Sequence, residues 1–135
     1  MYVMVENQLS IYDFVQPFGD ALDPENRWVK LANALDWQEM EEKYANNFGH
    51  SGVQALPLRM AFGSLVIRRA LNLSDTQTVQ LICESPYLQY FIGLRSFTVE
   101  PPFSAHSMAA FRRRIPQSRV EKAVRLLKKL SRRQK

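Results

Sequence analysis

Residues 86–115 read PYLQYFIGLRSFTVEPPFSAHSMAAFRRRI, and this stretch decides the fold. Ser85 precedes it as a candidate N-cap, and Pro86 suits the first helical position because an N–H there would have no helical partner. Gly93 is a typical helix terminator. Between these two ends Gln89 is the one strongly polar residue. The pattern predicts a short helix that is buried on nearly all sides.

The second half of the stretch predicts another helix, which follows a proline corner. Pro101 and Pro102 exclude helix from the residues just before them, and Ser104 is a candidate N-cap. Apolar residues then recur at spacings of three and four, at Met108, Phe111 and Ile115. The helix closes in Arg112, Arg113 and Arg114. Cations suit the negative end of a helix dipole, but three consecutive arginines exceed that need.

Several strings in and before this stretch carry a resemblance to a known family. They are ESPYLQYFIGL, F-T-x-E-P-P-F and the F-R-x-R ending, with RWVKLANALDWQEMEEKY, the helix expected over residues 57–71 and LSDTQTVQLICE upstream. Together, over about residues 24–115, they resemble the N-terminal domain of bacterial insertion-sequence transposases of the InsH-like, DDE type. The resemblance implies a module that recognises the terminal inverted repeats of the element. It also implies that strand transfer belongs to metal-binding carboxylates of a ribonuclease-H-like domain that follows this region.

Composition and charge favour a soluble, cytoplasmic protein that binds a polyanion. The chain has 135 residues, 46% of them hydrophobic, one cysteine and a net charge of +5. No apolar run is long enough to span a membrane, and no signal peptide is indicated. Eleven of the 18 basic residues lie from Ala105 onward, beside the single acid Glu121. An acidic body with a basic C-terminal end attracts nucleic acid, and for a transposase module this means association with the bacterial nucleoid.

Residues 1–22 form an apolar N-terminal arm. Ser10 is a candidate N-cap for a short helix that Pro17 and Gly19 would end. The apolar side chains of the arm must pack against something, and two interpretations remain. The arm covers the core of its own domain, or it contacts a second subunit in a homodimer.

Residues 23–48 predict a pair of antiparallel helices. Asp23 and Pro24 are expected to open the first helix, and Asp36 with Glu39 to open the second. Trp28 and Trp37 lie in apolar helical patterns, so we expect them to be core residues rather than platforms for base stacking. The following loop, residues 49–56, lacks the basic residues that the family resemblance would place there, which argues against a phosphate contact from this loop.

The next two helices have the outline of a helix-turn-helix. Pro57 opens a central helix in which Gly63 permits close packing, and Asn72 is a candidate left-handed terminator. Ser74 and Gln77 then predict a capping box. In one interpretation the second helix reads bases through Gln77 and Gln80, with Thr76 and Thr78 nearby, while Arg68 and Arg69 bind phosphates. In the other interpretation the pair is a purely structural helical hairpin.

Residues 116–135 predict a basic amphipathic helix. Ser118 and Glu121 suggest a further capping box, and an apolar stripe runs through Val120, Ala123, Val124, Leu127 and Leu130. Three interpretations compete: a helix docked on the body that binds phosphates, a helix lying on a membrane surface, and a solvated tail. The stripe has no aromatic residue, which disfavours the membrane. A helix that leads into a following domain is also compatible.

No catalytic constellation can be assembled from the sequence. His50 and His106 have no companion at metal-ligand spacing, and Cys83 lies in an apolar pattern that leaves its thiol inert. There is no glycine-rich phosphate loop. We therefore expect no cofactor, no metal and no small-molecule substrate, and a chain that is not an enzyme by itself.

These observations predict an all-α bundle of six or seven short helices, organised as arm (1–22), helical domain (23–115) and basic helix (116–135). Its partner is expected to be double-stranded DNA. The expected phosphate contacts are Arg112, Arg113, Arg114, Arg119, Lys122, Arg125, Lys128, Lys129, Arg132 and Arg133, with a second group of Arg68, Arg69, Gln77 and Gln80. The alternative function is a subunit-interaction module, or a truncated remnant that inhibits a transposase.

Overall fold

The computed structural model describes residues 2–5, 8–16, 21–46 and 55–132. Seven α-helices occur in this part of the chain: α1 (Arg27–Ala34), α2 (Trp37–Ala45), α3 (Leu58–Ala70), α4 (Asp75–Ile82), α5 (Pro86–Phe91), α6 (Ser107–Arg114) and α7 (Gln117–Arg132). The expected all-α class and helix number are confirmed. Across the described residues, none of the helices combines the length and apolar character needed to cross a membrane.

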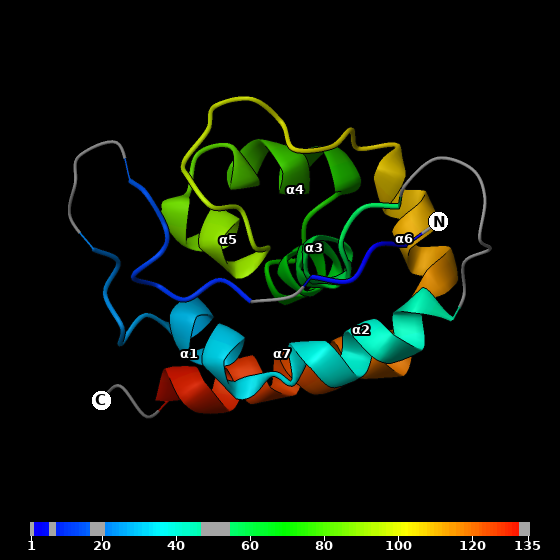
Figure 1. Cartoon of the computed structure of the whole chain (residues 1–135), viewed down its shortest axis with the longest axis horizontal. Helices are drawn as coiled ribbons and strands as arrows, with labels where there is room; N and C mark the ends of the chain where they lie inside the picture. Colours follow the sequence, from blue (N-terminus) through cyan, green and yellow to red (C-terminus); the bar gives the residue numbers. More distant parts are fainter. Residues whose placement is uncertain (1, 6–7, 17–20, 47–54, 133–135) are drawn as a thin grey trace.

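Helix α3 is the centre of the molecule. In Figure 1 it is seen nearly end-on, with α4 above it, α5 to its left, α6 to its right and α1, α2 and α7 below. It packs against α2, α4, α5, α6 and α7. Ten consecutive residues, 58–67, are buried, because neighbours surround the helix on every side. Gly63 allows α5 to approach closely, since a Cβ at this position would lie 3.0 Å from Ile92 Cγ2.

Helix α5 is the buried helix that its sequence predicts. The Ser85 hydroxyl accepts from the Leu88 N–H at 3.2 Å, Pro86 holds the first helical position, and Gly93 ends the helix at φ +88°. Gln89 is completely buried, and both the nitrogen and the oxygen of its side-chain amide form hydrogen bonds with the backbone. Its Nε2 donates to Ile82 O at 2.9 Å and Thr98 O at 2.8 Å, while its Oε1 accepts from the Thr98 N–H at 2.9 Å.

The turn between α3 and α4 also agrees with the sequence. Asn72 has φ +55°, the left-handed conformation expected of a helix terminator. Ser74 and Gln77 form the reciprocal capping box: the Ser74 hydroxyl accepts from the Gln77 N–H, and Gln77 Oε1 accepts from the Ser74 N–H. The sequence therefore determines where α4 begins.

Both tryptophans are core residues, as expected. Trp28 and Trp37 are buried, and both pack against Phe91 of α5. The Trp37 indole N–H donates to Ala32 O at 2.9 Å, so its polar atom is satisfied. The two rings thus join α1 and α2 to α5.

The N-terminal arm packs on its own chain. Leu9, Ile11, Phe14 and Leu22 are buried in the core. The Tyr2 hydroxyl donates to the buried Glu41 carboxylate at 2.6 Å and accepts from the Leu58 N–H at 2.7 Å. Burial, followed by the Glu41 contact, raises the pKa of Tyr2 well above its usual range. The buried residues of the arm thus cover its own core, whereas Val3, Met4, Tyr12 and Val15 are exposed, and a homodimer contact stays a prediction.

The expected short helix after Ser10 is wrong. Residues 11–13 form a turn in which the Ser10 hydroxyl donates to the Asp13 carboxylate at 3.0 Å. The chain then runs extended, with Val15 N–H donating to Arg95 O and Phe97 N–H donating to Val15 O, both at 2.9 Å. Pairing with the segment after α5 satisfies the backbone here and replaces helical hydrogen bonds. The expected terminators Pro17 and Gly19 lie outside the described residues.

Helix α7 docks on the body through its apolar stripe. Val120, Ala123, Val124 and Leu127 are buried, and the helix packs against α1 and α3. The docking of this helix on the body is therefore confirmed, while its binding of phosphates stays a prediction. The expected capping box at Ser118 is wrong, because the helix already begins at Gln117, directly after Pro116. The Glu121 carboxylate instead accepts from Arg69 and from Gln117.

Two other helix starts are shifted from their expected positions. Asp23 accepts from the Glu25 N–H in a turn, and α1 begins later, with Asn26 as its N-cap. Ser104 likewise lies in a turn, its carbonyl accepting from the Ser107 N–H, and the N-cap of α6 is His106. In both cases a hydrogen-bonded turn precedes the first regular helical turn.

Candidate nucleic-acid interface

The exposed side of α7 carries a row of cations. Lys122, Arg125 and Lys129 follow one another at spacings of three and four, which places them on one face, opposite the buried stripe. All three are exposed, as is Lys128 on the flank of the same helix. None of these four forms a salt bridge with the described residues. Arg132 ends the helix, and Arg133 lies outside the described part of the chain.

The three arginines of α6 are exposed but differ in their surroundings. Arg112 donates to the Asp75 carboxylate through two nitrogens, Nη1 at 2.7 Å and Nη2 at 3.1 Å. Arg114 lies near the buried Tyr44, whose pKa is raised by burial and lowered in part by this arginine's charge. Arg113 projects from the same last turn of the helix.

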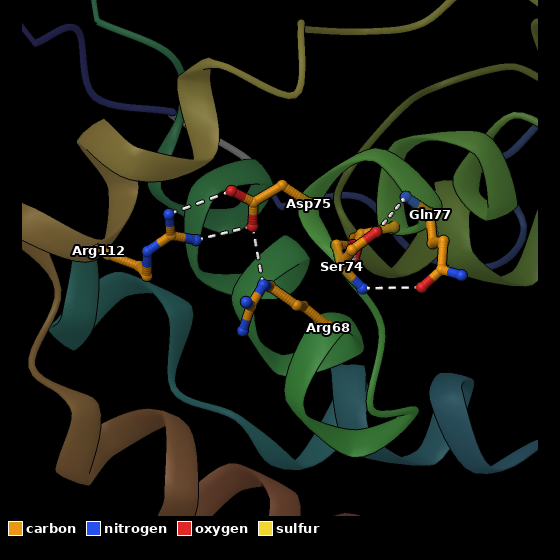
Figure 2. A network of polar contacts seen from close by, with 6 residues as sticks. Arg68, Ser74, Asp75, Gln77 and Arg112 are labelled. Atoms are coloured by element: carbon orange, nitrogen blue, oxygen red, sulfur yellow. Dashed lines mark hydrogen bonds and ion pairs between the residues drawn. The ribbon is translucent and has the colours of Figure 1, made fainter.

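Asp75 is the centre of a cluster that joins three helices (Figure 2). It occupies the first turn of α4 and accepts from Arg68 Nε of α3 at 2.7 Å as well as from Arg112 of α6. The hydrogen bonds from Arg112, and to a smaller extent that from Arg68, lower the pKa of the Asp75 carboxyl. The contact between Arg112 and Asp75 also raises the pKa of Arg112. The two arginines are therefore engaged with one carboxylate.

Two further arginines of the expected set form ion pairs that hold α7 in place. Arg69, next to Arg68 in the last turn of α3, donates to Glu121 at 2.6 Å. Arg119 donates to both carboxylate oxygens of Glu39 in α2 at 3.3 Å. Glu39 also contacts Lys43 at 2.7 Å, and these two cations lower its pKa to about 2.

The polar residues of α4 are only partly available. Thr76, Gln77 and Gln80 are exposed. The Gln77 Oε1 is used in the capping box, which leaves its amide nitrogen to donate. Thr78 is completely buried and donates to Ser74 O, so its expected position near base edges is wrong. The assignment of α3 and α4 as a DNA-reading helix-turn-helix stays a prediction.

The acids that bind the expected cations were missed as partners at the sequence level. Asp75 and Glu39 look like ordinary residues of helix starts, and Glu121 looks like part of a capping box. A spacing of seven residues across a tight turn, as between Arg68 and Asp75, is a weak indication of contact. The partners of Arg112 and Arg119 are 37 and 80 residues away, and no local pattern reveals them.

Other candidate reactive groups are separate from these clusters. Cys83 is partly buried, and burial, together with Glu100 and Glu84, raises the pKa of its thiol. Within the described ranges, no three side chains among His, Cys, Asp and Glu come together as metal ligands. His50 and most of the loop at residues 49–56 lie outside those ranges.

Comparison with known proteins agrees with the resemblance seen in the deciding stretch. A family model described as "Transposase domain (DUF772)" matches residues 16–114. The chain belongs to this transposase domain family. Its matched region includes α1 to α6 and part of the arm, with α7 following directly.

A relative from Rhizobium meliloti, "Uncharacterized protein ORF8 in nfe locus", is 30% identical to this transposase-family chain over 112 residues. The match covers 80% of the chain and 54% of the relative, so the chain spans about half the length of that protein. No solved structure shows a significant match.

Proposed function

We propose that this transposase-family chain is a module that binds double-stranded DNA at the terminal inverted repeats of an insertion sequence. Its role is recognition, and strand transfer belongs to the ribonuclease-H-like domain that the family resemblance implies. The observation that carries the proposal is the outward face of α7. There Lys122, Arg125 and Lys129 point away from the core on a helix whose other side is fixed to the body.

A docked basic helix is better suited to phosphate binding than a solvated tail of the same charge. The buried stripe holds the backbone in place, so little ordering of the chain opposes binding. Because these three cations form no salt bridge with the described residues, a phosphate does not have to displace a carboxylate. Sequence selection belongs to the second group, through Gln80 and the amide nitrogen of Gln77 on α4.

The alternative, a subunit-interaction module, receives less support. It would use the apolar arm or the apolar stripe of α7 to pair subunits. Leu9, Ile11 and Phe14 of the arm, and Val124 and Leu127 of the stripe, are buried within the chain itself. These side chains are therefore already occupied.

The test is a fluorescence-anisotropy titration at several salt concentrations. It uses one duplex with the terminal inverted repeat of the encoding element and one scrambled duplex of equal length. The variant is Lys122→Ala/Arg125→Ala/Lys129→Ala. We expect it to weaken binding to both duplexes and to reduce the slope of log affinity against log salt by up to about three, near 0.9 per lost phosphate contact.

A control variant removes the same charge elsewhere. Arg27→Ala/Lys30→Ala/Arg95→Ala takes three cations that are outside the salt bridges of α7, and we expect a much smaller change in slope. If both triple variants change the slope by the same amount, the effect depends only on net charge, and α7 is not part of the DNA interface. If the wild-type chain binds neither duplex, and its mass by light scattering rises with concentration, the subunit-interaction function replaces this proposal.

A further inference from the structure

Asp75 occupies the positions on two arginines that a DNA phosphate would take. Arg112 presents its fork to the carboxylate in the bidentate geometry that guanidinium groups also use for phosphate. Arg68 adds a third donor from another helix, as Figure 2 shows. Both arginines belong to the set that the sequence assigns to phosphate contacts. In the free protein they are therefore not available as simple phosphate ligands.

The cluster lies close enough to solvent for DNA to reach it. The side chains of Arg68 and Arg112 are 36% and 39% exposed, and that of Asp75 is 28% exposed. An exposed ion pair contributes little net stability, so exchanging it for a phosphate contact costs little. By contrast, Arg59 is buried and donates to three backbone carbonyls, and it has no such access.

Asp75 also places a negative charge beside any DNA that approaches α4. A phosphate that does not displace the carboxylate is repelled by it, whereas one that does displace it gains two arginines. Asp75 therefore repels the phosphate backbone of any DNA that approaches α4 in an arbitrary register. A duplex docked in one register can compensate for this repulsion with base contacts from the exposed side of α4.

We propose that Asp75 is an internal competitor of DNA phosphate, which holds Arg68 and Arg112 in the free protein and releases them only to a correctly placed backbone. This inference rests on the proposed function. Asp75 is thus a specificity-determining residue of the interface: it lowers affinity for arbitrary sequences more than affinity for the terminal repeat.

The test compares Asp75→Asn with Glu84→Gln in the same duplex titration. Both variants lose one negative charge, and Glu84 is an exposed residue just beyond α4. For Asp75→Asn we expect at least about threefold tighter binding of the scrambled duplex, a smaller gain for the repeat duplex, and a salt slope steeper by about 0.9–1.8. Glu84→Gln should change both affinities equally and slightly. In a background of Arg68→Gln/Arg112→Gln, Asp75→Asn should give no more than the slight gain of Glu84→Gln.

A measurement on the wild-type protein covers the case in which Asp75→Asn does not fold. The arginine side-chain N–H resonances of Arg68 and Arg112 are followed by NMR, each assigned from its loss in the Arg→Lys variant. We expect both to shift when the repeat duplex is added, because phosphate replaces carboxylate.

Resonances that stay in place while the duplex binds would show that the cluster is only a structural clamp between α3, α4 and α6. Identical affinities for Asp75→Asn and Glu84→Gln would overturn the inference as well, and leave the proposed function standing. Failure of the wild-type chain and of Asp75→Asn to bind any duplex would overturn the proposed function and this inference together.

Discussion

At the scale of single residues, Arg59 shows how a buried charge is accommodated by backbone carbonyls, with no salt bridge to a carboxylate of the described residues. It donates to Phe91 O and Tyr90 O at 2.9 Å and to Leu9 O at 3.2 Å. The first two carbonyls belong to the C-terminal turn of α5, where the helix dipole is negative, and Tyr90 O also accepts from the Gly93 N–H. The guanidinium also lies over the rings of Trp37 and Tyr90, about 5 Å from each centroid. One side chain thus joins the arm, α3 and α5.

We expect Arg59→Met to lower the free energy of unfolding by about 2–4 kcal/mol, because Phe91 O loses its donor and Tyr90 O and Leu9 O each lose one of their donors. Urea denaturation followed by circular dichroism measures the change. The control is Arg95→Met, which replaces an exposed arginine nearby in the fold. If the two variants unfold at the same urea concentration, the three hydrogen bonds of Arg59 contribute no net stability.

Residue roles were predictable where a local pattern determines them. Ser85, Pro86 and Gly93 limit α5 as expected, and the capping box of Ser74 and Gln77 is present. The excess of basic residues at the C-terminal end was predictable, but the acidic partners of individual arginines were not. Arg69, Arg112 and Arg119 contact acids 37 to 80 residues away, and only the tertiary fold brings these groups together.

At the scale of elements, α7 is joined to the body by two kinds of contact. Its apolar stripe packs against α1 and α3, and salt bridges from Arg119 and Glu121 fix its first two turns to α2 and α3. The stripe was evident from spacings of three and four. The start of the helix was not evident. Ser118 and Glu121 match a capping box, but the helix begins one residue before Ser118, at Gln117, directly after Pro116.

The salt bridges of this region make stability dependent on pH. Contacts with Lys43 and Arg119 lower the pKa of Glu39 to about 2, and arginine contacts also lower the pKa of Asp75 and Glu121. In the unfolded chain these carboxyls have their ordinary values near 4, so the unfolded state takes up protons first as the pH falls. Their contribution is present above about pH 4.5 and is lost progressively toward pH 2.

We therefore expect the melting temperature to fall as the pH is lowered from about 5 to about 2.5. Differential scanning calorimetry at low ionic strength measures it. Glu39→Gln removes one of the titrating groups and should make the fall shallower, whereas Glu84→Gln, at a position with no salt bridge in the described part of the chain, should leave it unchanged. A melting temperature that is flat across this range would show that the ion pairs contribute nothing.

At the scale of the whole molecule, the class of the fold and a central helix after Pro57 were predictable, but the burial of polar residues in that helix was not. The stretch at residues 86–115 supplies the buried α5 and the basic end of α6, yet the helix with the most neighbours is α3. Its sequence contains Arg59 and Ser64, two polar residues that ordinarily face solvent and are buried here. Arg59 binds backbone carbonyls of α5 and the arm, and Ser64 donates to Met60 O at 2.7 Å. Long-range packing therefore determines that these two polar side chains are buried.

The packing of the arm predicts how unfolding depends on protein concentration. Phe14 is buried against Tyr90, with ring centroids 6.2 Å apart, and Leu9 and Ile11 lie in the same core. Because these contacts are formed within one chain, the urea midpoint of unfolding should be the same at protein concentrations of about 1 μM and about 100 μM. Phe14→Ala should lower the free energy of unfolding by about 3–5 kcal/mol at every concentration. Tyr12→Ala, at an arm position that is 85% exposed, should change it little. A midpoint that rises with concentration in the wild-type chain, and no longer does so in Phe14→Ala, would show that the arm packs on a second subunit instead.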